Sequence, residues 1–497
     1  MARPLLLPAL AILACAFSCG EPRPVPARPN VLLVVADTLR ADRLPMYGCE
    51  RDNAPFLGEL AERSLVFESA WSPAPWTVPA TASLMTSVYP LQHGVVDAFE
   101  PDADEDERAE MRVNRLPDGV ETLAEMFRDH GYRTFGVSAN ALVGMEMGFH
   151  RGFDRFVALA FVDADVVNAA LFEWVDEITD PAATAPWFVY LHYFDPHDNY
   201  VQRSPWFDVA GLEAPDEDAA SAFARVRGMI RREEVEDLEY AEELADWSTH
   251  FVERRGADPP EEAPSAAIDR MFAAYDSEIR FLDEHIRQAF ARLDPEGTAA
   301  VVFTVDHGEE LLDHAEIGHG QSLYNELVRV PLLVRTPGPD APTGRVSTHV
   351  STMDVLPTFR ELLGAGPSPQ DQGASLLGEL SDDRTVFSMR MDWPSPGAYG
   401  YGAAAAREEE GAVVQGRDKL IFRDEERFTL TQLVDLATDP NEAGNQSGGR
   451  AARAAELRER YERLAEELPR WERTFGTAVV DDELRAALVE LGYTGDD

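Results

Sequence analysis

Five apolar runs of strand length, each ending abruptly in polar residues, constrain the fold of this chain more than any other feature. Because the runs are apolar throughout rather than alternating, they predict strands that are covered on both faces. Helical patterns separate them, and this alternation is typical of an α/β domain built on a mostly parallel sheet. The runs are Val31–Ala36, Thr134–Val137, Trp187–Tyr193, Ala299–Val305 and Val330–Arg335.

The sequence pattern changes after residue 376. Short strand-like segments predict a small antiparallel subdomain over 377–445, and amphipathic patterns such as Ala451–Arg473 predict C-terminal helices over 446–497. The α/β domain itself is expected to occupy 31–376. Within that domain, we interpret the acidic and arginine-rich stretch 206–264 as a helical insertion and assign it no chemistry.

The first residues are typical of an export signal. Arg3 precedes the apolar run Leu5–Phe17, which is too short to span a bilayer and ends just before Cys19. We interpret 1–19 as the signal peptide of a bacterial lipoprotein lipidated at Cys19. Lipidation at Cys15 and cleavage without a lipid are the alternatives. The proline-rich stretch 20–30 would be a tether. This predicts a protein of the cell envelope, in the periplasm or at the surface, that meets the membrane only through its anchor.

The charge balance excludes one class of partner. Lys and Arg number 44 against 90 Asp and Glu, which gives a formal net charge of −46. Such a surface repels polyphosphate backbones, so we expect no nucleic-acid partner. Nearly all of the positive charge is arginine, and Lys419 is the only lysine.

A threonine at a predicted helix start is the first candidate for chemistry. Thr77 is followed by Pro79 and an apolar helical stretch, which places it at or near the N-cap. A capping threonine is the simplest interpretation. The alternative is a nucleophile, because a helix N-terminus favours negative charge on an oxygen. A hydroxyl is barely ionised at neutral pH, however, and needs a base or a metal.

Three side chains that follow predicted strands could hold such a metal. Asp37 follows the first apolar run, and Asp306 and His307 follow the fourth. Because the carboxyl ends of parallel strands lie at one edge of a sheet, these residues should meet there. With the Thr77 oxygen they form a mixed ligand set that suits one divalent cation, Zn²⁺ or Mn²⁺ rather than Ca²⁺. Taken singly, each could instead cap a helix or pair with a neighbour.

Further polar residues follow the same strands. We expect His197 and His319 to hold anionic oxygens or to protonate a leaving group, although each histidine alone could equally be structural. Asp195 or Asp198, together with these two histidines, would allow a second metal. The remaining candidates are Asn140, which we place in the catalytic group, and His192, Asp195 and His314, which we assign to substrate binding.

Six segments of the chain form motifs that are known from one enzyme family. They are Asn30–Asp42, Thr77–Val95, Asp306–Glu310, Tyr324–Leu332, Asp354–Thr358 and Asp435–Glu442. Through them the chain resembles the sulfatase family, from about Pro29 to Asn445. That family belongs to the alkaline phosphatase superfamily, and the resemblance implies the same α/β sheet.

The chain departs from the sulfatase pattern at the residues that carry the chemistry. Sulfatases have Cys or Ser, converted to formylglycine, where this chain has Thr77, and an arginine where it has Thr81. The secondary alcohol of threonine would give a ketone, so formylglycine cannot form. His319 stands where an active-site lysine is expected, Thr38 replaces the second of two aspartates, and His307 replaces an asparagine.

The set Asp37, Thr77, Asp306 and His307 instead resembles that of lipoteichoic acid synthases and nucleotide pyrophosphatase/phosphodiesterases. The resemblance implies that Thr77 attacks phosphorus and forms a phosphothreonine, which water or an alcohol resolves, while Asn140 helps to hold the transferring group. We therefore expect a metal-dependent hydrolase or transferase of phosphate or phosphonate esters, acting on a small-molecule, glycan or lipid substrate. The alternatives are a sulfuric ester hydrolase without formylglycine and a catalytically silent exported binding protein.

Overall fold

The computed structural model describes residues 28–98, 110–198, 200–205, 264–314, 316–391, 409–424, 429–479, 484–485 and 487–488. The predicted signal peptide, most of the tether and the predicted insertion up to residue 263 lie outside this part of the chain. Within the described ranges, no helix combines the length and apolar character that crossing a bilayer requires.

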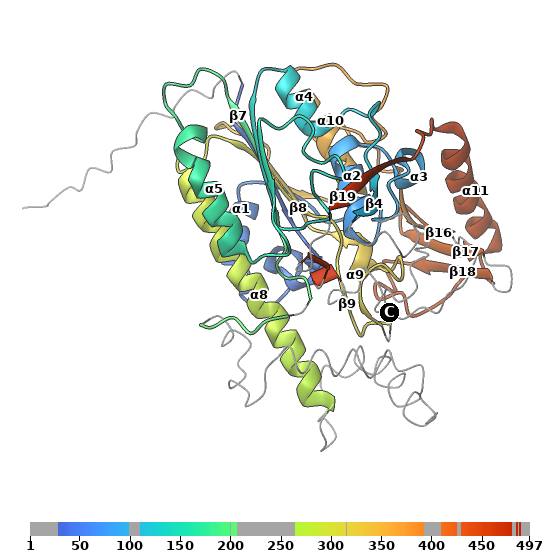
Figure 1. The fold of residues 1–497 in the computed structure, drawn as a ribbon. Coiled ribbons are helices and arrows are strands. Elements are labelled where there is room, and N and C mark those ends of the chain that lie inside the picture. The colour runs from blue at the N-terminus through green and yellow to red at the C-terminus, as the bar shows by residue number, and fades with distance from the viewer. Residues whose placement is uncertain are drawn as a thin grey trace, which may run out of the picture.

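An eight-stranded sheet forms the centre of the fold (Figure 1). Its strand order is β13-β2-β12-β8-β1-β7-β5-β6, and the strands from β8 to β6 run parallel to one another. Four of the predicted runs form parallel strands of this sheet, so the predicted α/β class is confirmed. The parallel strands are β1 (Val31–Ala36), β5 (Arg133–Ser138), β6 (Arg155–Ala158), β7 (Trp187–Tyr193) and β8 (Ala300–Val305).

The fifth predicted run, Val330–Arg335, is divided between two sheets. Pro331 has no N–H group for a strand ladder and interrupts the run. The part after it forms β12 (Leu332–Arg335), which pairs antiparallel with β8, so its end lies at the sheet edge opposite to that of β8. The other short strands here are β2 (Leu65–Phe67) and β13 (Gly344–Val346) in the central sheet, and β3 (Ala70–Trp71), β11 (Arg329–Val330) and β14 (Val350–Ser351) in a three-stranded sheet.

Helices cover both faces of the central sheet (Figure 1). On one side lie α1 (Pro55–Ala61), α5 (Ala164–Ile178) and α8 (Pro264–Leu293). On the other side lie α2 (Thr77–Thr86), α4 (Leu123–Asp129) and α10 (Val355–Leu362). The shorter elements are α3 (Pro90–His93), α9 (Asn325–Val328), β9 (Glu310–Leu311), β10 (Ile317–Gly318) and the 3₁₀ helices Ala41–Arg43, Pro45–Tyr47 and Thr352–Asp354.

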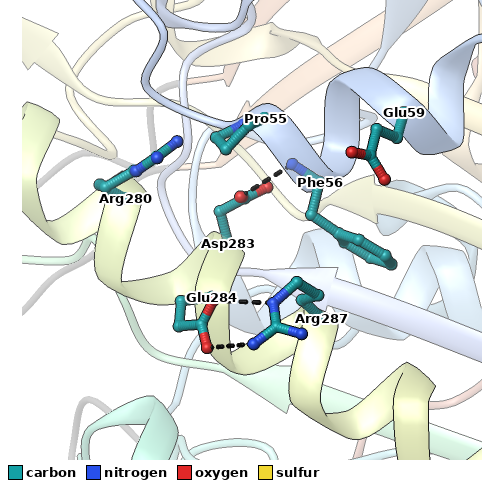
Figure 2. A pocket seen from close by; sticks show the side chains of 7 residues that line it. All are labelled: Pro55, Phe56, Glu59, Arg280, Asp283, Glu284 and Arg287. Carbon is teal, nitrogen blue, oxygen red and sulfur yellow. Dashed lines mark hydrogen bonds and ion pairs between the residues drawn. The ribbon is translucent and has the colours of Figure 1, made fainter.

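A surface pocket lies between α1 and α8 (Figure 2). Asp283 of α8 points to the start of α1 and accepts hydrogen bonds from the backbone N–H groups of Phe56 and Leu57, at 3.0 and 2.8 Å. These donors have no partner within the first helical turn, and Ala54 before it offers no side-chain acceptor. Asp283 therefore fastens α1 to α8, and none of the predicted site residues that the structure describes lines this pocket.

The predicted small antiparallel sheet after residue 376 is present. One face packs against α11 (Ala451–Glu467) through Leu457 and Tyr461, and the other packs against Trp71 and Leu327 of the larger domain. Its strands are β15 (Thr385–Met391), β16 (Glu409–Gln415), β17 (Asp418–Asp424) and β18 (Thr429–Asp435).

The C-terminal residues differ from the predicted helices. α11 ends at Glu467 rather than Arg473, because Leu468 precedes Pro469 and a residue before proline is disfavoured in a helix. Thr474–Val479 then forms β19, which pairs antiparallel with β4 (Glu110–Arg115). Most of the last predicted helix lies outside the described residues.

Candidate active site

The ends of β1 and β8 bring two buried carboxylates to one edge of the central sheet. Asp37 directly follows β1, and Asp306 directly follows β8. The two strands are neighbours with Ala36 opposite Val305, so the two aspartates leave the sheet side by side. Both side chains are buried, as the sequence predicts for residues that meet beyond parallel strands.

A histidine of β7 lies between these carboxylates. His192 Nε2 is 3.8 Å from Asp37 Oδ2 and 3.8 Å from Asp306 Oδ2. One ligand atom from each of the three residues lies within 4.8 Å of the others. From the sequence, we predict that His192 binds substrate. The observed strand register places His192 here, because it lies opposite Val35, and Val35 shares a sheet face with Asp37 two residues on.

The centre of this group contains polar atoms without partners. Among the described residues, Asp37 Oδ1, Asp306 Oδ2 and both ring nitrogens of His192 are buried and lack a hydrogen-bond partner. Burial raises the pKa of Asp37 to about 6. Burial and the neighbouring Asp37 charge raise the pKa of Asp306 well above its usual range. Burial also lowers the pKa of His192 to about 3, so its imidazole is neutral. Two carboxylates and a neutral imidazole are a donor set that fits a divalent cation.

Thr77 faces this group from the start of α2. It is the first residue of the helix, after Trp76 in extended conformation, and its side chain is buried. Its Oγ1 lies 3.2 Å from Nε2 of His307. The same Nε2 is 3.4 Å from Asp37 Oδ1 and 3.6 Å from Asp306 Oδ2. The structure therefore brings together all four residues that the sequence predicts as metal ligands.

The backbone fixes the proton of His307. Nδ1 lies 2.9 Å from the carbonyl oxygen of Gly308. A carbonyl only accepts hydrogen bonds, so Nδ1 carries the proton and Nε2 presents its lone pair. Burial, together with the nearby His319, lowers the pKa of His307 well below its usual range. The neutral Nε2 can thus either bind a cation or accept the Thr77 hydroxyl proton.

Two further histidines flank His307. The rings of His307 and His319 have centroids 4.6 Å apart, and His197 lies 4.8 Å from His319 by the same measure. Glu309 accepts a hydrogen bond from His319 Nδ1 at 2.9 Å and orients its ring. Burial would lower the pKa of His197, but the hydrogen bond and charge of Asp198 raise it to about 10. His197 is therefore a cation at neutral pH. Glu309 is a supporting residue that we did not identify from the sequence.

Asn140 holds Asp37. Its Nδ2 donates a hydrogen bond of 2.9 Å to Asp37 Oδ2, and its Oδ1 accepts one of 2.9 Å from the backbone N–H of Leu142. Both ends of the amide are thus engaged within the protein. This contact orients a carboxylate of the cluster, whereas the resemblance implies that Asn140 helps to hold the transferring group.

Two other predicted substrate residues make their contacts elsewhere. Asp195 Oδ1 lies 3.5 Å from Arg203. His314 pairs with Glu326 and stacks on Tyr324. Among the described residues, neither Asp195 nor Asp198 forms a close group of three ligand atoms with His197 and His319, so the geometry favours the single metal of the prediction over the second one that these residues would allow.

The single lysine belongs to the C-terminal sheet. Lys419 is buried, pairs with Glu442 at 2.7 Å and donates to Asn325 Oδ1 at 3.0 Å. Lys419 is therefore engaged by Glu442, and the cationic side chain described in the histidine group beside Thr77 is His197, whereas His192 and His307 are neutral.

Sequence comparison assigns most of the chain to one family. The sulfatase family profile matches residues 29–365, and the profile named N-sulphoglucosamine sulphohydrolase, C-terminal, matches residues 317–468. A curated relative is the multifunctional alkaline phosphatase superfamily protein PehA of Trinickia caryophylli, which is 26% identical over 85% of this chain and 91% of its own.

Solved structures show the same fold at lower identity. The phosphonate monoester hydrolase of Agrobacterium radiobacter superposes with a TM-score of 0.61 at 20% identity, over 88% of this chain and 95% of its own. A protein solved with its substrate D-glucosamine-2-N,6-O-disulfate gives a TM-score of 0.64 at 17% identity, over 88% and 97% of the two chains. The likeness thus extends both to phosphonate ester and to sulfate ester enzymes.

Proposed function

Because the chain belongs to the sulfatase family of the alkaline phosphatase superfamily, we propose that it is a metal-dependent hydrolase of phosphate or phosphonate esters with Thr77 as its nucleophile. The observation that carries this proposal is the 3.2 Å contact between Thr77 Oγ1 and His307 Nε2, beside two buried carboxylates. A buried helix-start hydroxyl that faces acids and an imidazole, rather than a backbone donor, is arranged for activation.

A divalent cation is part of the proposal. Asp37, Thr77, Asp306 and His307 would hold it, and His192 adds a fifth candidate ligand to the predicted set. The mixed oxygen and nitrogen donors favour Zn²⁺ or Mn²⁺ over Ca²⁺. Such a cation lowers the pKa of a bound hydroxyl and offsets charge on the ester oxygens.

The protein groups account for the remaining steps. Thr77 Oγ1 attacks phosphorus and its proton leaves to solvent, while the bond from phosphorus to the leaving oxygen breaks. His319, oriented by Glu309, protonates that oxygen. The cationic His197 holds the non-bridging oxygens. Water then attacks phosphorus and returns Thr77 to its hydroxyl form, whereas an alcohol in place of water would make the reaction a transfer.

Sulfate esters are the second candidate substrate class. The relatives described as sulfatases favour them, as does the structural neighbour solved with a disulfated glucosamine. The same nucleophile and cation could act on sulfur, but without the formylglycine on which sulfatases depend. In both proposals, the ester group could be carried by a glycan, a lipid or another small molecule. The third candidate, a catalytically silent binding protein, is disfavoured because all four predicted metal ligands are present and lie close together. They are Asp37, Thr77, Asp306 and His307.

We also propose, from the sequence alone, that the protein is exported and lipid-anchored at Cys19. Cys19→Ala should move it from the membrane fraction to the soluble fraction of the producing bacterium, whereas Cys15→Ala should not. The opposite pattern would assign the anchor to Cys15.

The test of the proposed function is turnover of a panel of phosphate monoesters, diesters, phosphonates and sulfate esters by the Zn²⁺- or Mn²⁺-loaded protein. Thr77→Ala should abolish turnover, and Thr77→Ser should retain part of it because both hydroxyls can attack. A preference for sulfate esters would show that these, and not phosphate or phosphonate esters, are the substrates. Full activity of Thr77→Ala would show that Thr77 is not the nucleophile.

A further inference from the structure

A second group of metal-ligating side chains lies outside the site around Thr77. Glu310 is in β9, His314 is in the turn between β9 and β10, and Glu326 is in α9. One ligand atom of each lies within 4.8 Å of the other two. His314 was predicted to bind substrate, but its Nδ1 pairs with Glu326 Oε1. The proposed reaction uses none of these residues.

A buried oxygen of Glu310 is a second observation, besides the grouping of the three side chains, that indicates a bound ligand. Its side chain is fully buried, and its Oε1 accepts a hydrogen bond of 2.6 Å from the Ser322 hydroxyl. Among the described residues, Oε2 has no hydrogen-bond partner. A buried carboxylate oxygen without a donor or a counter-charge is costly, so its burial calls for a partner that the protein itself does not supply.

The basic side chains near this group are already engaged. Arg40 is bound by Asp42 at 2.8 Å and by Asp313, and Lys419 is bound by Glu442. The surroundings of Glu310 are otherwise acidic: Glu326, Asp313 and Glu316 all act on it as like charges. A cation is therefore the ligand that the local charge favours.

We propose that Glu310, His314 and Glu326 bind a divalent cation of the zinc or manganese class, separate from the one beside Thr77. Two carboxylates and an imidazole leave a fourth position for water, as is common for Zn²⁺. On binding, His314 Nδ1 releases its proton to solvent, which the ring can reach because 17% of its side chain is exposed. The Ser322 hydroxyl and the Tyr324 ring, stacked on His314 at 3.6 Å between centroids, orient the ligands.

The cation would tie together the two segments that support the active site. Gly308 N–H donates to the carbonyl of Leu327 at 2.7 Å, and a Cβ at Gly308 would lie 1.8 Å from the carbonyl oxygen of Glu326. The loop that carries Asp306 and His307 thus packs directly on α9. A cation bridging β9 to α9 would hold this contact closed, so its role is structural.

The experiment is a metal count on the full chain, loaded with Zn²⁺, passed through a desalting column and analysed by mass spectrometry for bound metal. The wild type should hold about two equivalents, and Asp306→Asn about one. His314→Gln and Glu310→Gln should each hold about one, and Asp306→Asn combined with His314→Gln almost none. Glu379→Gln, an exposed carboxylate outside both sites, is the matched control and should retain both equivalents.

A second readout separates a ligand from a merely structural residue. Glu310→Gln replaces a buried carboxyl group by an amide of nearly the same size. Without a metal role for Glu310, the variant should keep the wild-type melting temperature and the wild-type rise in that temperature on adding Zn²⁺. The proposal predicts instead that part of this rise is lost in Glu310→Gln and His314→Gln. Circular dichroism establishes that each variant is folded.

Two results would overturn the proposal. One is a wild type with a single equivalent that Asp306→Asn removes. The other is a second equivalent that survives His314→Gln and Glu310→Gln but is lost in His319→Gln. Neither result tests the role of Thr77 as the nucleophile, because that role is tested by turnover of the Thr77 variants.

Discussion

Replacement of Asn140 by alanine separates the two roles that this residue could have. Asn140 donates a 2.9 Å hydrogen bond to the buried Oδ2 of Asp37, and this bond lowers the pKa of that carboxyl. A buried hydrogen bond to a charged group contributes about 1.5–3 kcal/mol. If Asn140 acts by holding Asp37, the variant should therefore bind Zn²⁺ about 10- to 100-fold more weakly.

The assay is competition with a chelator of known affinity, followed by turnover at saturating metal. The loss of affinity should shrink as the pH is raised, because the carboxylate then ionises without the help of the amide. Asn168→Ala is the matched control: it removes a buried amide that contacts Tyr193 and His285, so it should lower stability but not metal affinity. Unchanged affinity combined with a lower kcat at saturating metal would refute this reasoning and return Asn140 to the transferring group.

The remaining predictions concern pH, the flanking histidines and the scaffold. In the metal-free protein the pKa of Asp37 is raised to about 6, so stability should fall as the pH rises through 6, and Zn²⁺ should abolish this fall; calorimetry against pH measures both. Glu309→Gln should lower kcat and leave KM nearly unchanged, since it disturbs the orientation of His319 and not substrate binding. A change in KM as large as the change in kcat would contradict this. His197→Gln should weaken inhibition by an anionic phosphate analogue at pH 7, because a cation is lost. Asp283→Ala should lower the free energy of unfolding by about 1–2 kcal/mol without changing turnover, since it removes the cap of α1.

The central strands, and the site residues that directly follow them, could be predicted because continuous apolar runs are typical of a sheet with helices on both faces. Asp37 and Asp306 follow adjacent parallel strands, so their proximity follows from topology alone. Val330–Arg335 is another such run, but Pro331 interrupts it and divides it between two sheets. The sequence pattern also does not show that β12 runs antiparallel to β8. β19 was also missed, because its pairing with β4 joins residues more than 350 positions apart.

The contacts of the site were harder to predict than its members. His192 and Asp37 meet because of strand register, which a single strand pattern does not fix. Likewise, His314 follows the motif Asp306–Glu310 closely in sequence, yet the turn after β9 directs it to Glu326. Local sequence shows which residues can do chemistry, whereas their partners depend on tertiary packing.

The most direct test of the account is to find where the substrate group is carried during turnover. The metal-loaded protein, quenched with acid while it hydrolyses a phosphodiester and digested, should yield a phosphorylated peptide whose modified residue is Thr77. The same peptide should be unmodified in Thr77→Ala. A modification on any other residue, or rapid turnover by the alanine variant, would contradict the account.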